Sequence, residues 1–201
     1  MRLAVVNLKG GTGKTTTAVH LAAGLGRRGR TLLVDADPQG SASEWSALAG
    51  ADLPYTTMTH AQPDLHRRLR ESAMSGYEHV VMDTPPGHEA IVRSALLVAD
   101  EVVIPVAPSF MDINRLRPTI ALIAAVAGDN NPSVRVLLTR VRSQTRMAWL
   151  SREALTELGF PVLESDIPLL EAYVTGFGMV PPEGHRYGAL LDELLMTEVA
   201  A

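Results

Sequence analysis

The sequence predicts an α/β fold in which helices flank a doubly wound, mostly parallel β-sheet. Apolar runs alternate along the 201 residues with longer amphipathic segments, the pattern of repeated βαβ units. Several runs consist of Val, Ile and Leu without polar alternation, as expected for strands buried on both faces. A glycine-rich loop follows the first apolar run and precedes an amphipathic segment, which predicts a strand–loop–helix unit at the amino terminus.

The individual elements follow from these runs and from the Gly, Pro, Asn and Asp residues between them. We expect strands at Leu3–Leu8, Thr31–Ala36, Tyr77–Asp83, Glu101–Val106 and Val134–Thr139, with weaker candidates at Leu53–Met58 and Pro161–Leu163. We expect helices at Lys14–Arg28, Pro63–Ser75, His88–Val98, Ile113–Ala127, Thr145–Leu158 and Tyr187–Val199. Because no repeat, linker or compositional break interrupts the pattern, a single domain is predicted over residues 1–201.

The composition excludes several classes of protein. Hydrophobic residues make up 46% of the chain, enough for one well-buried core. With zero cysteines, disulfide frameworks, thiolate zinc sites and iron–sulfur clusters are excluded. No apolar stretch approaches the ~20 residues of a membrane-spanning helix, and no signal peptide precedes the first strand. We therefore expect a cytoplasmic protein that does not bind membranes.

Basic residues are distributed unevenly in type and in position. Only two of the eighteen are lysine, Lys9 and Lys14, so these positions are predicted to need a compact ammonium group on a flexible stem. Residues 133–152 contain five arginines and no acid, whereas residues 153–201 contain nine acids and one arginine. Any surface that binds a polyanion is therefore expected before the acidic segment.

The glycine-rich loop reads Lys-Gly-Gly-Thr-Gly-Lys-Thr-Thr from Lys9 to Thr16. Its glycines let backbone N–H groups curl around an anion, and the following helix adds partial positive charge. The loop predicts a nucleotide phosphate site, with Lys14 on the β- and γ-phosphates and the Thr15 hydroxyl on Mg²⁺. The predicted nucleotide-binding residues are Gly10, Gly11, Thr12, Gly13, Lys14, Thr15 and Thr16. A turn that merely packs the strand against the helix is the alternative.

The loop departs from the general G-x-x-x-x-G-K-[ST] pattern, because Leu8 stands where the first glycine would be. Here the chain resembles the ParA/MinD family of deviant Walker A P-loop ATPases, whose motif K-G-G-x-G-K-[ST] carries an added signature lysine. The resemblance implies that Lys9 is this lysine, and that it binds the phosphates of the partner's ATP across a face-to-face dimer. Lys9 and Lys14 would then both be catalytic, and the homodimer would form when ATP is bound. An ordinary solvated loop lysine is the alternative for Lys9.

Carboxylates end two predicted strands: Asp35 and Asp37 end the second, and Asp83 ends the third. Because the carboxyl ends of parallel strands meet at one edge of a sheet, we expect them beside the glycine loop. Asp83 fits the Walker B position that organises Mg²⁺, with Asp35 and Thr15 supporting the metal shell. The resemblance assigns to Asp37 the orientation of the attacking water. Alternatively, Asp35 and Asp37 cap a following helix or turn.

Contacts to the adenine are expected from the resemblance. Pro108 lies in a proline-rich loop that resembles the family's segment near the adenine and the dimer interface. Thr139 and Arg140 end the next strand, where similar proteins contact the adenine edge. A plain strand-to-helix connection, a structural threonine and a solvated arginine are the alternatives.

An arginine-rich segment leads into the helix expected at Thr145–Leu158. Helical periodicity places Met147, Leu150, Ala154, Leu155 and Leu158 on the core side and leaves Arg146, Trp149 and Arg152 outside. Together with Arg140 and Arg142, Arg146 and Arg152 form a candidate patch for DNA phosphates, with no reading of bases. The resemblance points the same way, since ParA dimers bind chromosomal DNA. A solvated helix face is the alternative.

The resemblance implies a slow ATP hydrolase that uses ATP and Mg²⁺, similar to the short ParA proteins of plasmid partition and carboxysome positioning. Non-specific DNA and a ParB-like or McdB-like adaptor would be its partners, and it would be associated with the nucleoid. MinD has a basic membrane helix at its carboxyl end, whereas no basic residue follows Arg186 here. A small-molecule ligase on the same fold and a MinD-like positioning regulator are the alternatives.

Overall fold

The computed structural model describes residues 1–71, 76–142 and 146–198. Seven strands form one sheet in the order β3-β2-β4-β1-β5-β6-β7, and every neighbouring pair is parallel. The strands are β1 (Arg2–Val5), β2 (Thr31–Asp35), β3 (Thr56–Thr59), β4 (His79–Asp83), β5 (Glu101–Val106), β6 (Ser133–Val141) and β7 (Val162–Pro168). The predicted doubly wound α/β fold is confirmed, and the sheet is parallel throughout.

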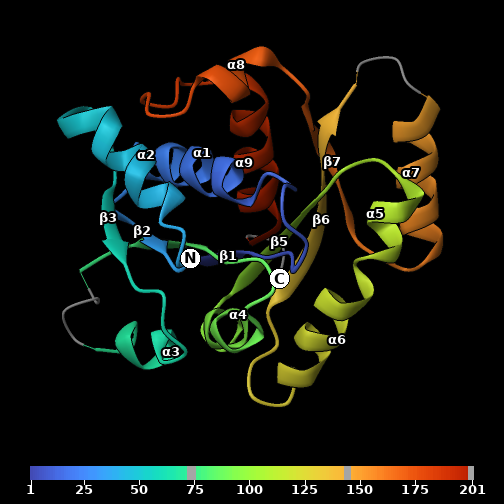
Figure 1. Ribbon diagram of the computed structural model, residues 1–201, viewed down its shortest axis with the longest axis horizontal. Coiled ribbons are helices and arrows are strands. Elements are labelled where there is room, and N and C mark those ends of the chain that lie inside the picture. The colour runs from blue at the N-terminus through green and yellow to red at the C-terminus, as the bar shows by residue number, and fades with distance from the viewer. Residues whose placement is uncertain (72–75, 143–145, 199–201) are drawn as a thin grey trace.

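Helices cover both faces of the sheet (Figure 1). One layer contains α1 (Lys14–Gly26), α2 (Ser41–Ala49), α8 (Glu171–Thr175) and α9 (His185–Glu198). The other contains α3 (Leu65–Arg68), α4 (Glu89–Leu96), α5 (Phe110–Asn114), α6 (Arg117–Val126) and α7 (Arg146–Glu157), and a 3₁₀ turn, η1, spans Gly50–Asp52. Alternate strand residues feed the two cores, since Leu3 and Val5 pack on the first layer whereas Ala4 and Val6 pack on the second.

The strand β1 lies between β4 and β5, where the direction of chain winding reverses. In open parallel sheets the ligand crevice lies at this switch point, beyond the carboxyl ends of the strands. β1 ends at Val5 rather than at the predicted Leu8, because the next residues bond to other elements. Asn7 Nδ2 donates to the Pro105 oxygen at 2.9 Å, and the Leu8 N–H donates to Thr119 Oγ1 at 3.1 Å. The glycine-rich loop is thereby attached to β5 and α6.

Several predicted helix bounds are wrong. The helix expected at Ile113–Ala127 is two helices, α5 and α6, because Pro118 occupies the first turn of α6 and has no N–H to continue α5. Of the helix expected at Pro63–Ser75, only Leu65–Arg68 is helical among the described residues, and residues 72–75 lie outside them. The helices α2 and α8 were not predicted.

The predicted core stripe of α7 is also wrong in part. Met147 is 38% exposed and Leu158 is 63% exposed, whereas Ser151 and Leu155 are buried. Small side chains at positions 148, 151 and 154 lie on the buried side of the helix. Trp149 is 60% exposed, as expected for the outer side. Thr145, the predicted first residue, lies outside the described residues.

Candidate functional site

The glycine-rich loop joins β1 to α1 at the switch point of the sheet. Gly11 and Gly13 have φ of 74° and 90°, a left-handed conformation that residues with a Cβ rarely adopt. Gly13 directly precedes α1, so the loop ends at a helix amino terminus with its unpaired N–H groups. The predicted order of strand, loop and helix is therefore present.

Lys14 lies inside this loop and is only 7% exposed. Its ammonium donates to the main-chain oxygen of Lys9 at 3.0 Å. Burial lowers the pKa of Lys14, and the nearby carboxylates of Asp83 and Asp37 act in the opposite direction. A buried ammonium close to two carboxylates can bind the negative charge of a phosphate chain.

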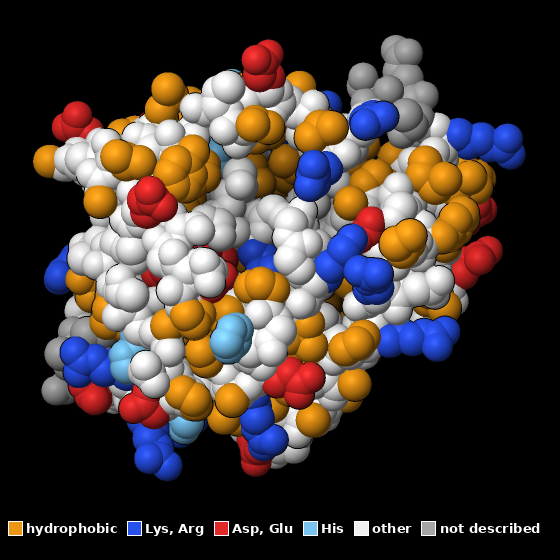
Figure 2. All heavy atoms as spheres, in the orientation of Figure 1, with side chains coloured by type: hydrophobic (Ala, Val, Ile, Leu, Met, Phe, Trp, Pro, Cys, Tyr) orange, Lys and Arg blue, Asp and Glu red, His pale blue; other side chains and the backbone are white. Residues whose placement is uncertain are grey.

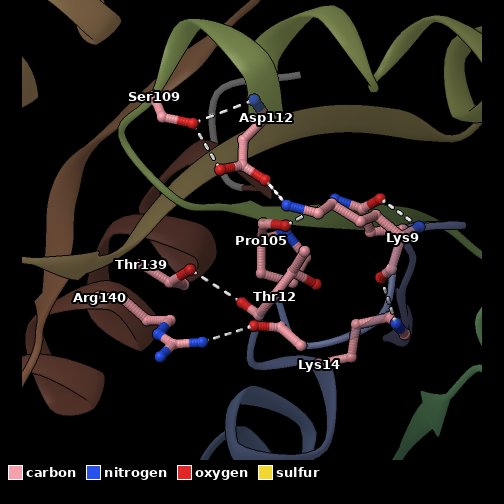
Figure 3. A network of polar contacts seen from close by, with 10 residues as sticks. Lys9, Thr12, Lys14, Pro105, Ser109, Asp112, Thr139 and Arg140 are labelled. Carbon is pink, nitrogen blue, oxygen red and sulfur yellow. Dashed lines mark hydrogen bonds and ion pairs between the residues drawn. The ribbon is translucent and has the colours of Figure 1, made fainter.

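Lys9 points away from Lys14, toward the loop between β5 and α5 (Figure 3). Its ammonium forms an ion pair with Asp112 Oδ1. The other oxygen of Asp112 accepts a hydrogen bond from Ser109 Oγ at 2.5 Å. Ser109 also caps α5, because its hydroxyl accepts the Asp112 N–H at 3.1 Å. The ammonium groups of the chain's two lysines thus have different surroundings: that of Lys14 lies inside the loop, and that of Lys9 lies against Asp112.

The predicted carboxylates meet beside the loop. Asp35 and Asp83 are direct neighbours in the register of β2 and β4, which confirms that the two motifs converge. Asp35 Oδ1 accepts the Asp37 N–H at 3.1 Å, and its Oδ2 accepts the Ser43 N–H at 2.7 Å. Asp37 Oδ1 accepts the Gln39 N–H at 2.9 Å. These bonds fit the alternative in which Asp35 and Asp37 hold a turn and the start of α2.

Asp83 differs from the other two carboxylates, because it is 1% exposed and neither of its oxygens has a hydrogen bond of ordinary geometry among the described residues. Burial raises the pKa of Asp83 to about 7, with Asp35 acting in the same direction. The Thr15 hydroxyl and the Lys14 ammonium lower it, although less strongly. The protein therefore keeps a carboxyl group beside Thr15 that lacks a strong partner.

These residues fit a magnesium ion. Mg²⁺ in nucleotide sites is usually held by one or two protein oxygens and keeps several waters. The buried oxygens of Asp83 and the neighbouring hydroxyl of Thr15 supply such ligands. Asp35 is engaged by backbone N–H groups, so it would orient the site rather than bind the ion through a free oxygen. Bound Mg²⁺ would neutralise charge on the phosphate oxygens.

Thr139 and Arg140 hold the glycine-rich loop from β6. Thr139 Oγ1 donates to the Thr12 oxygen at 2.8 Å, and the Arg140 guanidinium donates to the Gly11 oxygen at 3.0 Å (Figure 3). Arg140 has φ of 56°, an uncommon left-handed conformation for a residue other than glycine. Pro108 lines a neighbouring cavity of about 370 Å³ together with Arg140 and Leu169.

A second cavity of about 350 Å³ opens beside Gly11, Gly13 and Thr16. Most of its lining was not predicted, because β7 continues to Pro168 instead of ending at Leu163. The missed residues come from the end of β7, the residues that follow it, α8 and α9: Ile167, Pro168, Leu169, Leu170, Tyr173, Val174 and Tyr187. A largely apolar cavity beside a phosphate loop has the character of a nucleobase pocket. The position of Leu169 and Leu170 directly after a strand was the signal available in the sequence.

Tyr173 and Tyr187, which line this cavity, belong to a cluster of aromatic rings around His20. His20 stacks on Tyr187 with ring centroids 4.4 Å apart, and it meets Tyr173 and Trp45 edge to face. Burial, assisted by the nearby His185 and Arg27, lowers the pKa of His20 to about 4. His20 is therefore neutral at physiological pH and acts as a packed ring.

The predicted DNA-binding arginines differ in their surroundings. On the face of the molecule that Figure 2 shows, Lys and Arg side chains gather over the end of β6 and over α5 and α7. Arg140, Arg142 and Arg146 are exposed. The Arg152 guanidinium instead donates to the main-chain oxygens of Leu163 and Glu164, the latter at 3.2 Å. Arg152 thus ties α7 to β7.

The parallel sheet, the glycine loop before α1 and the carboxylates at the ends of β2 and β4 define a P-loop nucleotide-binding protein. The chain belongs to the CobQ/CobB/MinD/ParA nucleotide-binding domain family, whose model matches residues 3–176. Within this family it is a ParA-type ATPase.

Named relatives support this assignment. The chain is 41% identical to maintenance of carboxysome distribution protein A of Gloeobacter kilaueensis, over 85% of this chain and 78% of the relative. It is 30% identical to the chromosome-partitioning ATPase Soj of Thermus thermophilus, over 96% of this chain and 95% of the relative.

Solved structures agree on the fold. The apo McdA structure from Cyanothece superposes with a TM-score of 0.81 at 20% identity, covering 96% of this chain and 98% of that one. Cobyrinic acid a,c-diamide synthase of Mycobacterium smegmatis, with a bound ATP analogue and magnesium, has a TM-score of 0.77 at 23% identity, covering 99% and 96%. Among the described residues, no helix has the length and apolar character needed to cross a membrane.

Proposed function

We propose that this ATPase is a nucleotide-dependent switch: ATP and Mg²⁺ bring two copies face to face, and the dimer binds DNA and positions a cargo. The observation that carries the proposal is the different direction of the two lysines. Lys14 is buried inside the P-loop, whereas the Lys9 side chain leaves the loop toward α5 and its ammonium pairs with Asp112. A lysine directed out of its own site is suited to binding the triphosphate of a second copy.

Within each copy, the residues of the site would have separate roles that follow from their surroundings. Lys14 and the loop N–H groups would bind the phosphates, and Asp83 with Thr15 would hold Mg²⁺. The adenine would lie in the cavity lined by Leu170 and Tyr173. Asp37 would orient the attacking water after leaving its present turn with Gln39. Because no strong activating group lies beside Asp37 among the described residues, intrinsic hydrolysis would be slow.

The exposed arginines at the end of β6 and the start of α7 support the DNA part of the proposal. Arg142 and Arg146 belong to a segment that has no acidic residue. Two such segments in a dimer would bind DNA phosphates without reading bases, with an affinity that falls steeply with salt. The names of the relatives favour a carboxysome or a chromosome as cargo. As the family resemblance implies, an adaptor protein would accelerate hydrolysis and the protein would be located on the nucleoid.

One experiment tests assembly and DNA binding together. Sedimentation with a non-hydrolysable ATP analogue and Mg²⁺ is expected to give dimers, and ADP is expected to give monomers. DNA binding should appear only with the analogue, and it should weaken in an Arg142→Glu, Arg146→Glu variant that still dimerises. Lys9→Ala should remain monomeric while it binds ADP normally. A wild-type protein that stays monomeric when saturated with the analogue contradicts the proposal and favours a small-molecule ligase.

A further inference from the structure

The Lys9 ammonium is already occupied in the isolated chain. Its partner, Asp112, lies 103 residues further along, at the start of α5. The side chains of Lys9 and Asp112 are 28% and 12% exposed, so solvent weakens this ion pair less than a surface pair.

The surroundings fix both partners of the ion pair. Ser109 holds the second oxygen of Asp112 and caps the same helix turn. On the other side, the Lys9 N–H donates to Asn7 Oδ1 at 2.9 Å, and Asn7 is bound to the Pro105 oxygen. The end of β5 therefore holds the Lys9 backbone through Asn7, and the start of α5 holds its ammonium.

We infer that Asp112 is a positioning residue that holds Lys9 within its own chain and competes with the triphosphate of the second copy. This inference rests on the proposed ATP-dependent dimer. The Lys9 ammonium has three donors, but a carboxylate in contact with it neutralises its charge and weakens its attraction to the phosphates of a second copy. The Asp112 carboxylate and those phosphates therefore compete for the charge of Lys9, and this competition sets how much nucleotide-bound protein assembly needs.

The exchange also concerns the surface around Asp112. Phe110 and Met111, the first two residues of α5, are 53% and 65% exposed. They are adjacent in sequence to the carboxylate that loses its cation when Lys9 leaves. Release of Lys9 would therefore free the start of α5 from the P-loop at the face where the second copy would bind.

The variant Asp112→Asn tests the competition with little change in shape. Asparagine keeps an oxygen for Ser109 and the backbone N–H for the helix cap, but it lacks the charge that holds Lys9. Asp112→Glu keeps the charge. Asp129→Asn is a matched control, since it removes one carboxylate from an exposed ion pair with Arg93, away from Lys9.

The first measurement needs neither nucleotide nor dimer. Because Lys9 and Lys14 are the only lysines, lysine acylation followed by peptide mass spectrometry reports each one separately. In nucleotide-free protein, Asp112→Asn should raise the acylation rate of Lys9 several-fold and leave that of Lys14 unchanged. Asp112→Glu and Asp129→Asn should behave like the wild type. An unchanged rate for Lys9 in Asp112→Asn overturns the inference.

The second measurement is the protein concentration at half dimerisation with a non-hydrolysable ATP analogue and Mg²⁺. Asp112→Asn should lower this concentration on the order of tenfold, while the affinity of the monomer for ADP stays the same. An equal or higher concentration in Asp112→Asn refutes the competition, because Asp112 would then be neutral in assembly or support it. A wild type that never dimerises refutes the proposed function instead, and the acylation result shows whether the contact itself was correct.

Discussion

The two ends of the proposed nucleotide cleft are built differently. The phosphate end consists of loop N–H groups, Lys14 and carboxylates at the ends of β2 and β4, which are polar groups in a largely buried setting. The base end consists mainly of apolar side chains that follow β7 and begin α8. The phosphate end therefore keeps buried charge that a ligand must compensate, whereas the apolar base end needs no such compensation.

Substitution of Asp83 is expected to have the largest effect. It tests whether the buried charge of the phosphate end lowers the free energy of unfolding. Its pKa is raised to about 7 in the folded protein, from an ordinary value near 3.8. Between pH 4 and 7 the folded state therefore binds about one more proton than the unfolded state, so the free energy of unfolding falls as pH rises through this range. Asp83→Asn should make the nucleotide-free protein more stable at pH 8 by an amount on the order of a few kcal/mol.

Thermal and urea unfolding of nucleotide-free wild type and Asp83→Asn from pH 4 to 8 check this prediction. The difference between the two should be small near pH 4 and should grow toward pH 8. Asp64→Asn is a suitable control, since this carboxylate is exposed and its pKa is lowered, chiefly by a hydrogen bond from His60. A wild type that equals or exceeds Asp83→Asn in stability at pH 8 would show that the buried carboxylate has a partner after all.

A substitution at the base end should change nucleotide affinity and leave the free energy of unfolding unchanged, whereas Asp83→Asn changes the free energy of unfolding. Val174 is 69% exposed and lines the apolar cavity, so Val174→Asp should leave the free energy of unfolding within about 0.5 kcal/mol of the wild type. Placing a carboxylate beside an apolar base should weaken ATP and ADP binding equally, by about tenfold. Nucleotide titration of the monomer measures both affinities.

A matched control for Val174→Asp is Met196→Asp on α9, because Met196 is 74% exposed and does not line the cavity. This variant should bind both nucleotides like the wild type. If Val174→Asp binds ATP and ADP normally, the base lies elsewhere and the assignment of this cavity is wrong.

The same difference explains what the sequence could predict. A phosphate and a metal ion need particular residue types at the ends of strands, so the convergence of Asp35 and Asp83 was predicted and then confirmed by the strand register. An apolar pocket needs only shape, and β7 is an edge strand whose polar residues 164–166 hid its true length. The contact between Lys9 and Asp112 depends on tertiary structure alone, because no local pattern joins residues so far apart. The break at Pro118 and the short helix α2 were available in the sequence but were missed.

Arg140 joins the two ends and gives the smallest expected effect. Its guanidinium holds the Gly11 oxygen, and its left-handed backbone costs about 1 kcal/mol in most residues other than glycine. Asparagine tolerates this conformation better than alanine does, so Arg140→Asn should be more stable than Arg140→Ala by several tenths of a kcal/mol.

Both variants lose the contact with the loop, and both should bind nucleotide about threefold more weakly, since an exposed hydrogen bond contributes about 0.5–1 kcal/mol. Thermal unfolding and nucleotide titration of the two variants separate the backbone effect from the side-chain effect. Equal stability of the two would show that the backbone of Arg140 carries no strain, and unchanged affinity would show that the loop keeps its shape without help from β6.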